Sequence, residues 1–132
     1  MATQAYPVHA YSSIDSTAAI ALVLERATAD ERRDRPFVRD VSGVFFELKR
    51  RGFKFRDLGL RKIPGGYYSE DVEGFVGQLL SMGYATQRSP IKLTKHGNEF
   101  CDTIIDRQGN KEEMARLRDE VDRIMQQVPA SV

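Results

Sequence analysis

Several residue types that support protein chemistry are scarce in this chain. Its 132 residues include one cysteine, two histidines and no tryptophan. The single cysteine, Cys101, excludes an internal disulfide, and no Cys/His cluster has the spacing of metal ligands, so we expect no metal site and no cofactor. A lone thiol fits a reducing compartment, which favours a cytoplasmic protein.

Long hydrophobic runs and a dominant sign of charge are also missing. The longest apolar run, Ala18–Leu24, is far too short to cross a bilayer, and residues 1–16 lack the basic-then-apolar pattern of a secretory signal. Twenty Lys and Arg residues against nineteen Asp and Glu residues give a net charge of +1. We therefore expect no membrane partner, and any electrostatic partner must be met by a local patch.

What remains is the composition of an ordinary globular domain. Hydrophobic residues make up 41% of the chain and charged residues 30%. A chain of this length closes one hydrophobic core but not two. We expect an N-terminal arm over residues 1–12, a main domain over 13–108 and a C-terminal amphipathic helix over 109–132.

The spacing of apolar residues predicts a largely helical protein. It indicates a first helix from about residue 13 and a second over 36–51, and a third over 69–82. A fourth begins after a threonine cap at 94 and ends before 109, and a capping box opens a last helix at 110. A glycine follows the second and the third helix, which is a common left-handed stop.

The connections between these helices carry the β-structure. Residues 53–63 fit neither the helical nor the strand period and are predicted as a short strand or an irregular connection, followed by a turn at 64–66. Residues 84–87 and 91–93 flank a Ser-Pro step and predict a short β-hairpin. The predicted class is therefore mainly α with a small β-hairpin (α+β).

The last helix carries apolar residues at alternating steps of three and four, about two heptads in length. A seam this short does not specify a coiled coil alone, so packing back onto the domain and pairing with a second subunit are both open. We expect a homodimer formed through this seam. Its residues are Met114, Leu117, Val121, Ile124 and Val128.

The stretch from Gly77 to Phe100 resembles the end of a winged helix. A Leu-rich helix ends at a glycine, a strand follows, and the hairpin closes with the Leu-Thr-x-x-Gly step from Leu93 to Gly97. This order is similar to that in bacterial regulators of the MarR and PadR kind. The resemblance implies a non-enzymatic winged-helix domain that binds DNA as a transcriptional regulator.

A looser likeness extends upstream of that stretch. The spacing of six residues is similar to that in the SocA or YwgA-like group of small proteins related to antitoxins. This resemblance implies protein binding at least as readily as operator recognition. The six residues are Gly52, Phe53, Phe55, Gly66, Tyr68 and Ser69.

Basic residues are concentrated at the end of the second helix and in the connection that follows it. Residues 49–62 hold seven Lys and Arg residues against a single acid, and three more cations follow on the predicted hairpin and at the start of the fourth helix. Such a patch predicts contacts with the phosphate backbone of double-stranded DNA. The alternative is a solvated helix end, where cations favour the C-terminal dipole. The predicted nucleic-acid-binding residues are Lys49, Arg50, Arg51, Lys54, Arg56, Arg61, Lys62, Arg88, Lys92 and Lys95.

Two features weigh against base reading by the third helix. A helix-turn-helix joins its two helices by three or four residues, whereas residues 53–68 separate the second and third helices predicted in this chain. The first turn of the third helix holds Glu70, Asp71 and Glu73, and no Lys or Arg follows through Met82, which is unfavourable near phosphates. The alternative function is a winged-helix protein–protein interaction module, antitoxin-like or an adaptor, without DNA binding.

The sequence offers no constellation of residues for catalysis. Cys101 follows His96 by five positions, which on a helix places the two side chains on different faces. The glycine pair at 65–66 lacks the context of a phosphate loop. We therefore expect a buried cysteine, no catalytic residues and a non-enzymatic protein.

Overall fold

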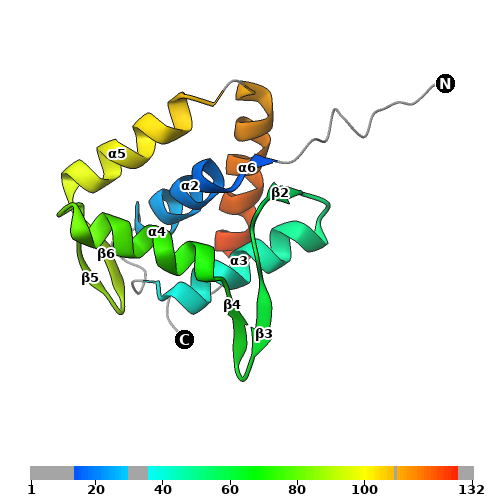
Figure 1. The fold of residues 1–132 in the computed structure, drawn as a ribbon. Helices are drawn as coiled ribbons and strands as arrows, with labels where there is room; N and C mark the ends of the chain where they lie inside the picture. Colours follow the sequence, from blue (N-terminus) through cyan, green and yellow to red (C-terminus); the bar gives the residue numbers. More distant parts are fainter. Residues whose placement is uncertain (1–13, 30–35, 109, 128–132) are drawn as a thin grey trace.

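The computed structural model describes residues 14–29, 36–108 and 110–127, which form a bundle of helices with small sheets attached (Figure 1). Within these ranges there are five helices and three two-stranded sheets. The predicted mainly α architecture with a small β-hairpin (α+β) is confirmed. The predicted arm over residues 1–12 lies outside the described residues. The helices are α2 (Ser16–Ala29), α3 (Val38–Arg50), α4 (Glu70–Ser81), α5 (Lys95–Asp106) and α6 (Lys111–Gln127).

The strands pair mostly as hairpins. The first two strands form a parallel pair, and the other four form two antiparallel hairpins, β3–β4 and β5–β6. The β5–β6 hairpin is the one predicted from the sequence. The β3–β4 hairpin lies in the region expected to be a connection and a turn, and Gly65 supplies the positive φ of its two-residue loop. The strands are β1 (Ile14–Asp15), β2 (Phe55–Arg56), β3 (Arg61–Ile63), β4 (Gly66–Tyr68), β5 (Ala85–Arg88) and β6 (Ile91–Leu93).

The core is built around α2. Every side chain from Ala18 to Leu24 is at most 3% exposed, so this helix is buried on all sides rather than along one stripe. A helix that is apolar all round needs neighbours on every face. Four helices, α3, α4, α5 and α6, contact it, and Figure 1 shows α2 crossing the middle of the molecule among them.

The seam of α6 packs into this same core. Met114, Leu117, Val121 and Ile124 are each at most 5% exposed within a single chain, where α6 lies against α2 and α3. These side chains are therefore not available to a second subunit, and the prediction that they form the dimer contact is wrong. The physical reason is that a helical stripe specifies a buried face but not the surface that covers it. Val128 lies outside the described residues, and a homodimer stays a prediction that needs another surface.

The Leu-Thr-x-x-Gly step closes the β5–β6 hairpin against α5. The Thr94 backbone N–H and hydroxyl both donate to the Tyr84 carbonyl, at 2.9 and 3.2 Å, and the hydroxyl oxygen accepts from the Gly97 N–H at 2.9 Å. Thr94 thus caps α5 while it holds the start of the hairpin. A Cβ at Gly97 would lie 2.0 Å from the Tyr84 carbonyl oxygen, so only glycine fits there.

A buried pair of serines joins α3 to the start of α4. The Ser42 hydroxyl donates to the Val38 carbonyl at 2.7 Å and accepts from the Ser69 N–H at 3.0 Å. The Ser69 hydroxyl in turn accepts from the Val72 N–H at 3.3 Å and caps α4. The chain between the two helices therefore leaves the end of α3, forms β2 and the β3–β4 hairpin, and returns to α3 to begin α4.

We predict that Gly97→Ala destabilises the fold, because the new methyl group must displace the Tyr84 carbonyl and its two hydrogen bonds. The free energy of unfolding in urea should fall by at least about 1–3 kcal/mol, the usual cost of overpacking. Gly74→Ala is the matched control, since a Cβ there meets nothing within 4 Å in α4. It should raise stability by about 0.5–1 kcal/mol. Equal stability of the two variants would contradict the tight approach at Gly97.

Candidate nucleic-acid interface

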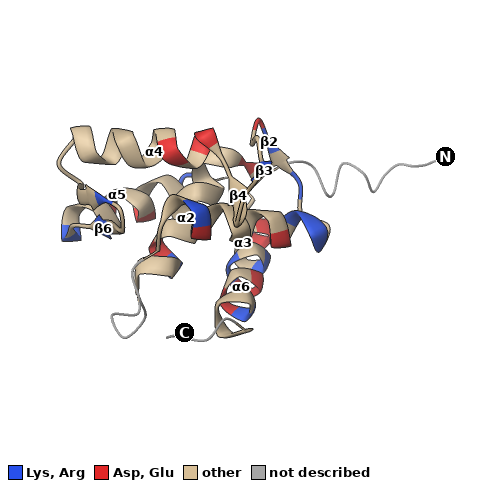
Figure 2. Cartoon of the chain, turned by 90° about the horizontal axis from the view of Figure 1, so that it is seen from below, with Lys and Arg blue, Asp and Glu red and all other residues tan. Residues whose placement is uncertain are grey.

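The ten basic residues predicted to bind nucleic acid do not lie on one surface. Figures 1 and 2 place the C-terminal end of α3 and the β5–β6 hairpin at opposite sides of the molecule. Lys49, Arg50 and Arg51 therefore lie far from Arg88 and Lys92. The continuous strip of charge that their sequence positions suggested is divided into two groups.

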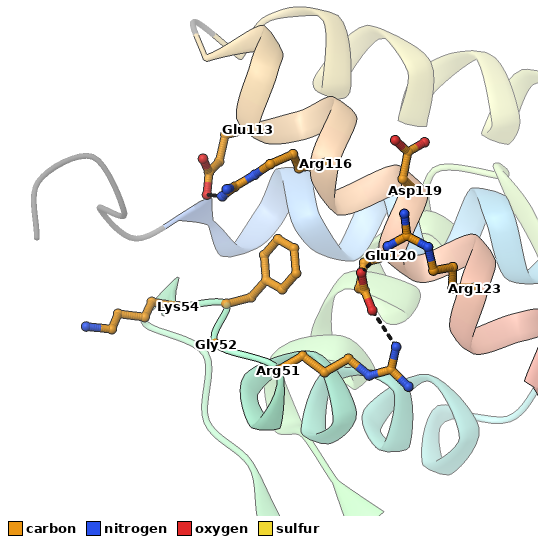
Figure 3. Close-up of a pocket in the computed structure, with 9 residues that line it drawn as sticks. Arg51, Gly52, Lys54, Glu113, Arg116, Asp119, Glu120 and Arg123 are labelled. Atoms are coloured by element: carbon orange, nitrogen blue, oxygen red, sulfur yellow. Dashed lines mark hydrogen bonds and ion pairs between the residues drawn. The ribbon is translucent and has the colours of Figure 1, made fainter. Parts of the chain in front are cut away.

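At the α3 end, Arg51 is part of an internal ion network. Its guanidinium donates to Glu47 at 3.0 Å, to Gln127 at 2.8 Å and to Glu120 of α6 (Figure 3). Arg50 also donates to Glu47, at 2.7 Å. The hydrogen bonds from Arg50 and Arg51 lower the pKa of Glu47 to about 2, and the bond from Arg51 lowers the pKa of Glu120. The charge of Arg51 thus ties α3 to α6 and is not free for a phosphate.

A groove of about 550 Å³ lies beside this network, between α6 and residues 51–54. Arg116 lies over the Phe53 ring at 5.8 Å, and α6 brings carboxylates and guanidinium groups to the same wall (Figure 3). Lys54 is exposed and makes no ion pair within the described residues. Because its charges are nearly balanced, this groove does not attract a polyanion.

The cation of β2 has a local carboxylate beside it. Arg56 lies 3.5 Å from Asp15 of β1, with which β2 forms its parallel pair. This pairing holds the start of α2 against the connection, since Asp15 also accepts a hydrogen bond from the Ala18 N–H at 3.1 Å. Arg56 is therefore engaged in the structure of the N-terminal end of α2.

The β3–β4 hairpin combines cations with aromatic rings. Arg61 lies over the Tyr68 ring at 5.0 Å, and Tyr67 stacks on Phe46 of α3 with ring centroids 4.0 Å apart. Lys62 is exposed and makes no ion pair within the described part of the chain. The aromatic contacts fix the hairpin against α3 and leave its two cations at the surface.

Arg39 belongs to this group, although the sequence reasoning did not include it. Its side chain lies against Gly66 at the start of β4, where an added Cβ would be 3.2 Å from the Arg39 Cγ. Arg39 is exposed on the first turn of α3. In the sequence Arg39 is only a cation on the polar face of a predicted helix. Nothing in that pattern indicates that Gly66, 27 positions later, lies beside it.

Glu73 of α4 connects the two hairpins. The Tyr68 hydroxyl of β4 donates to one of its carboxylate oxygens, and Arg88 of β5 donates to the other at 3.1 Å. Arg88 also approaches Gly77 one turn further along α4, where its Nη2 would lie 3.7 Å from a Cβ. Contacts therefore run without a break from Arg61 through Tyr68 and Glu73 to Arg88.

These contacts gather part of the predicted set on one side of the molecule. Figure 1 shows both hairpins projecting in the same direction from the helices. Lys92 of β6 is exposed and makes no ion pair within the described residues, and exposed Lys95 follows in the first turn of α5. We call the cations of this side the hairpin face. They are Arg39, Arg61, Lys62, Arg88 and Lys92.

The acids at the start of α4 have structural partners. Asp71 accepts a hydrogen bond from the Gly59 N–H at 2.7 Å, and Glu73 bonds to both hairpins as described. All three acids of the first turn, Glu70 included, are favoured by the positive end of the helix dipole. The acids of this turn thus have structural roles in the fold. Because α4 contains no Lys or Arg, it has no cation with which to bind a phosphate.

Cys101 and His96, the two residues weighed for catalysis, differ sharply in their exposure to solvent. Cys101 is fully buried, and burial raises the pKa of its thiol to about 11, whereas the His96 side chain is 80% exposed. In the ranges that the structure describes, no group of three or more His, Cys, Asp or Glu residues could hold a metal ion. Nor does any helix in these ranges have the length and apolarity needed to cross a membrane.

Comparison with known proteins gives no further guide, since the chain matches no family model, no curated protein and no solved structure.

We predict that acid weakens the link between α3 and α6. The pKa of Glu47 is about 2 in the folded chain against an ordinary 4.5, so its contribution to stability is complete above about pH 4.5 and is lost as the pH falls towards about 2. Urea midpoints measured across this range should fall more steeply for the parent chain than for Glu47→Gln. Glu112→Gln, at an exposed acid of α6, is the control and should keep the parent slope.

We predict that the Cys101 thiol is inert in the folded protein, because it is buried and protonated at neutral pH. Ellman's reagent should react only after urea unfolds the chain. Since the chain has a single cysteine, the released chromophore counts this site alone. Rapid labelling under native conditions would contradict the assignment of Cys101 to the core.

Proposed function

We propose that the chain is a non-enzymatic, winged-helix-like protein of the cytoplasm that binds double-stranded DNA through the hairpin face and acts as a transcriptional regulator. One observation carries this proposal. The two hairpins that carry Arg61, Lys62, Arg88 and Lys92 project in the same direction from a molecule whose net charge is only +1 (Figure 1). Because Lys62 and Lys92 are exposed and make no ion pair within the described residues, they favour a local positive potential that the whole-chain charge does not indicate.

The contacts available on this face suit the DNA backbone. Lys62 and Lys92 are exposed point charges on different hairpins, and Arg61 and Arg39 are exposed as well. Lys and Arg side chains on projecting loops commonly neutralise phosphates, and each phosphate contact releases counterions. Because the two hairpins are joined through Glu73, they approach a duplex as one unit.

The same structure favours binding with little base reading. The exposed part of α4 offers carboxylates rather than the Arg, Asn and Gln side chains that pair with base edges, apart from Gln78. Affinity then comes from phosphates, and dissociation constants of about 10⁻⁴–10⁻⁶ M at physiological salt are expected for such contacts. A second copy of the chain would raise this affinity by presenting two hairpin faces.

A protein partner is the second candidate, and the groove between α6 and residues 51–54 favours it. Both charge signs line this groove around the Phe53 ring, which matches a protein segment carrying both signs better than a polyanion. In that case the chain acts as an antitoxin-like or adaptor module. The double variant Lys54→Glu with Asp119→Lys, which reverses two charges of the groove, should then no longer bind the partner. The control variant Lys62→Ala, which leaves the groove unchanged, should still bind it.

We predict that removing lysines from the hairpin face weakens DNA binding specifically. Lys62→Ala with Lys92→Ala should reduce affinity for a labelled 20-base-pair duplex roughly tenfold at low salt and flatten the log–log salt slope by about 2. Fluorescence anisotropy over a salt series measures both quantities. These two lysines make no ion pair within the described residues, so the fold is not at risk.

Lys49→Ala with Lys54→Ala is the matched control. It removes the same charge from exposed lysines at the α3 end of the molecule and should leave the affinity and the slope close to those of the parent chain. Equal losses in the two double variants would reject the hairpin face as the binding surface. No binding by the parent chain at low salt would reject DNA binding and leave the protein partner as the function.

A further inference from the structure

Glu73 forms an ion pair with Arg88, an arginine of the hairpin face that could otherwise bind a phosphate. Its carboxylate accepts one hydrogen bond from Arg88 at 3.1 Å and one from the Tyr68 hydroxyl. The Arg88 side chain is 48% exposed and that of Glu73 is 33% exposed, so the pair lies at the surface within reach of a ligand. A phosphate arriving at this side of the molecule meets an arginine that already has an anionic partner.

The geometry of α4 strengthens this arrangement. Gly77 lies one turn after Glu73, and its missing side chain leaves room for the Arg88 guanidinium against the helix, 3.7 Å from where a Cβ would be. Arg88 therefore lies along α4 instead of extending from the hairpin. Carboxylates and phosphates bind a guanidinium through the same N–H donors, so they compete for it.

We propose that Glu73 acts as an internal competitor that restrains duplex binding at the hairpin face. A phosphate that takes Arg88 from Glu73 leaves the carboxylate without a cationic partner beside the DNA backbone, and like charges repel. Each duplex contact made by Arg88 is thus offset by the loss of an internal one. This inference rests on the proposed function, and it identifies the residue that sets the strength of binding.

The other acids of the same turn do not share this role. Glu70 is exposed and makes no hydrogen bond or ion pair within the described residues, and Asp71 is bonded to the Gly59 N–H. Glu70 therefore contributes only its charge to the field of the face. The comparison of Glu73 with Glu70 separates competition for Arg88 from general repulsion.

The test compares Glu73→Gln with Glu70→Gln on the 20-base-pair duplex over a salt series. Glutamine keeps the length of the side chain and an oxygen that accepts from Tyr68. Glu73→Gln should tighten binding about threefold to tenfold and steepen the log–log slope by about 1, because Arg88 joins the phosphate contacts. Glu70→Gln should tighten binding less and leave the slope unchanged.

The same two substitutions are then made in an Arg88→Ala background. Without the arginine, Glu73→Gln and Glu70→Gln should have equal small effects, since the coupling between positions 73 and 88 is gone. Circular dichroism confirms that each variant is folded. Glu73→Ala keeps a high helix propensity but removes the Tyr68 bond as well, and it replaces the glutamine variant if that one unfolds, with the same direction of change expected.

The outcomes separate the two proposals. If the parent chain binds the duplex but Glu73→Gln matches Glu70→Gln, or weakens binding, the competitor role is wrong and DNA binding stands. If Glu73→Gln still tightens duplex binding in the Arg88→Ala background, the competitor role is also wrong, because the effect then does not act through that arginine. If neither the parent chain nor any variant binds the duplex, both proposals fall.

Discussion

The arrangement of this protein depends on the burial of α2. A helix that is apolar on every face cannot rest against a single neighbour, and α3, α4, α5 and α6 must all contact it. The apolar stripes of the other helices, including the α6 seam, are therefore buried against α2. The β3–β4 and β5–β6 hairpins project from the bundle (Figure 1), and although Ala85 and Ile91 of the second hairpin pack into the core, Lys62 and Lys92 are exposed. The surface proposed to bind DNA is thus what remains after the core has been closed.

Local signals in the sequence predicted the elements well. The stripe of α4, the cap at Thr94 and the positive φ at Gly52 and Gly83 are all found, because each depends on interactions within a few residues. The β3–β4 hairpin escaped prediction because its charged and aromatic residues show no clean alternation. Its register is set by contacts such as Tyr67 on Phe46, which no local pattern contains.

The candidate site was predicted less well, for the same physical reason. The cations at the end of α3 were grouped with those of the β5–β6 hairpin, but these two elements lie at opposite sides of the molecule (Figures 1 and 2). Arg51 forms a hydrogen bond with Glu120, which lies 69 positions away in the sequence, and Arg39 contacts Gly66 of the β3–β4 hairpin. A run of charge in a sequence therefore identifies residues that share a composition, and only the topology decides which of them share a surface.

The close approach of Gly97 to the Tyr84 carbonyl has a consequence for how such a protein can change. The orientation of the β5–β6 hairpin relative to α5 is set by backbone atoms and by the Thr94 cap, at the base of the hairpin. The half nearer the loop is anchored as well, since Ile91 is buried in the core, its N–H donates to the Pro36 carbonyl at 2.7 Å, and Arg88 donates to Glu73 of α4. Exposed positions such as Gln87 and Lys92 take no part in that anchorage, so these two can change over evolutionary time, and with them the ligand of the hairpin, while the domain beneath stays as it is.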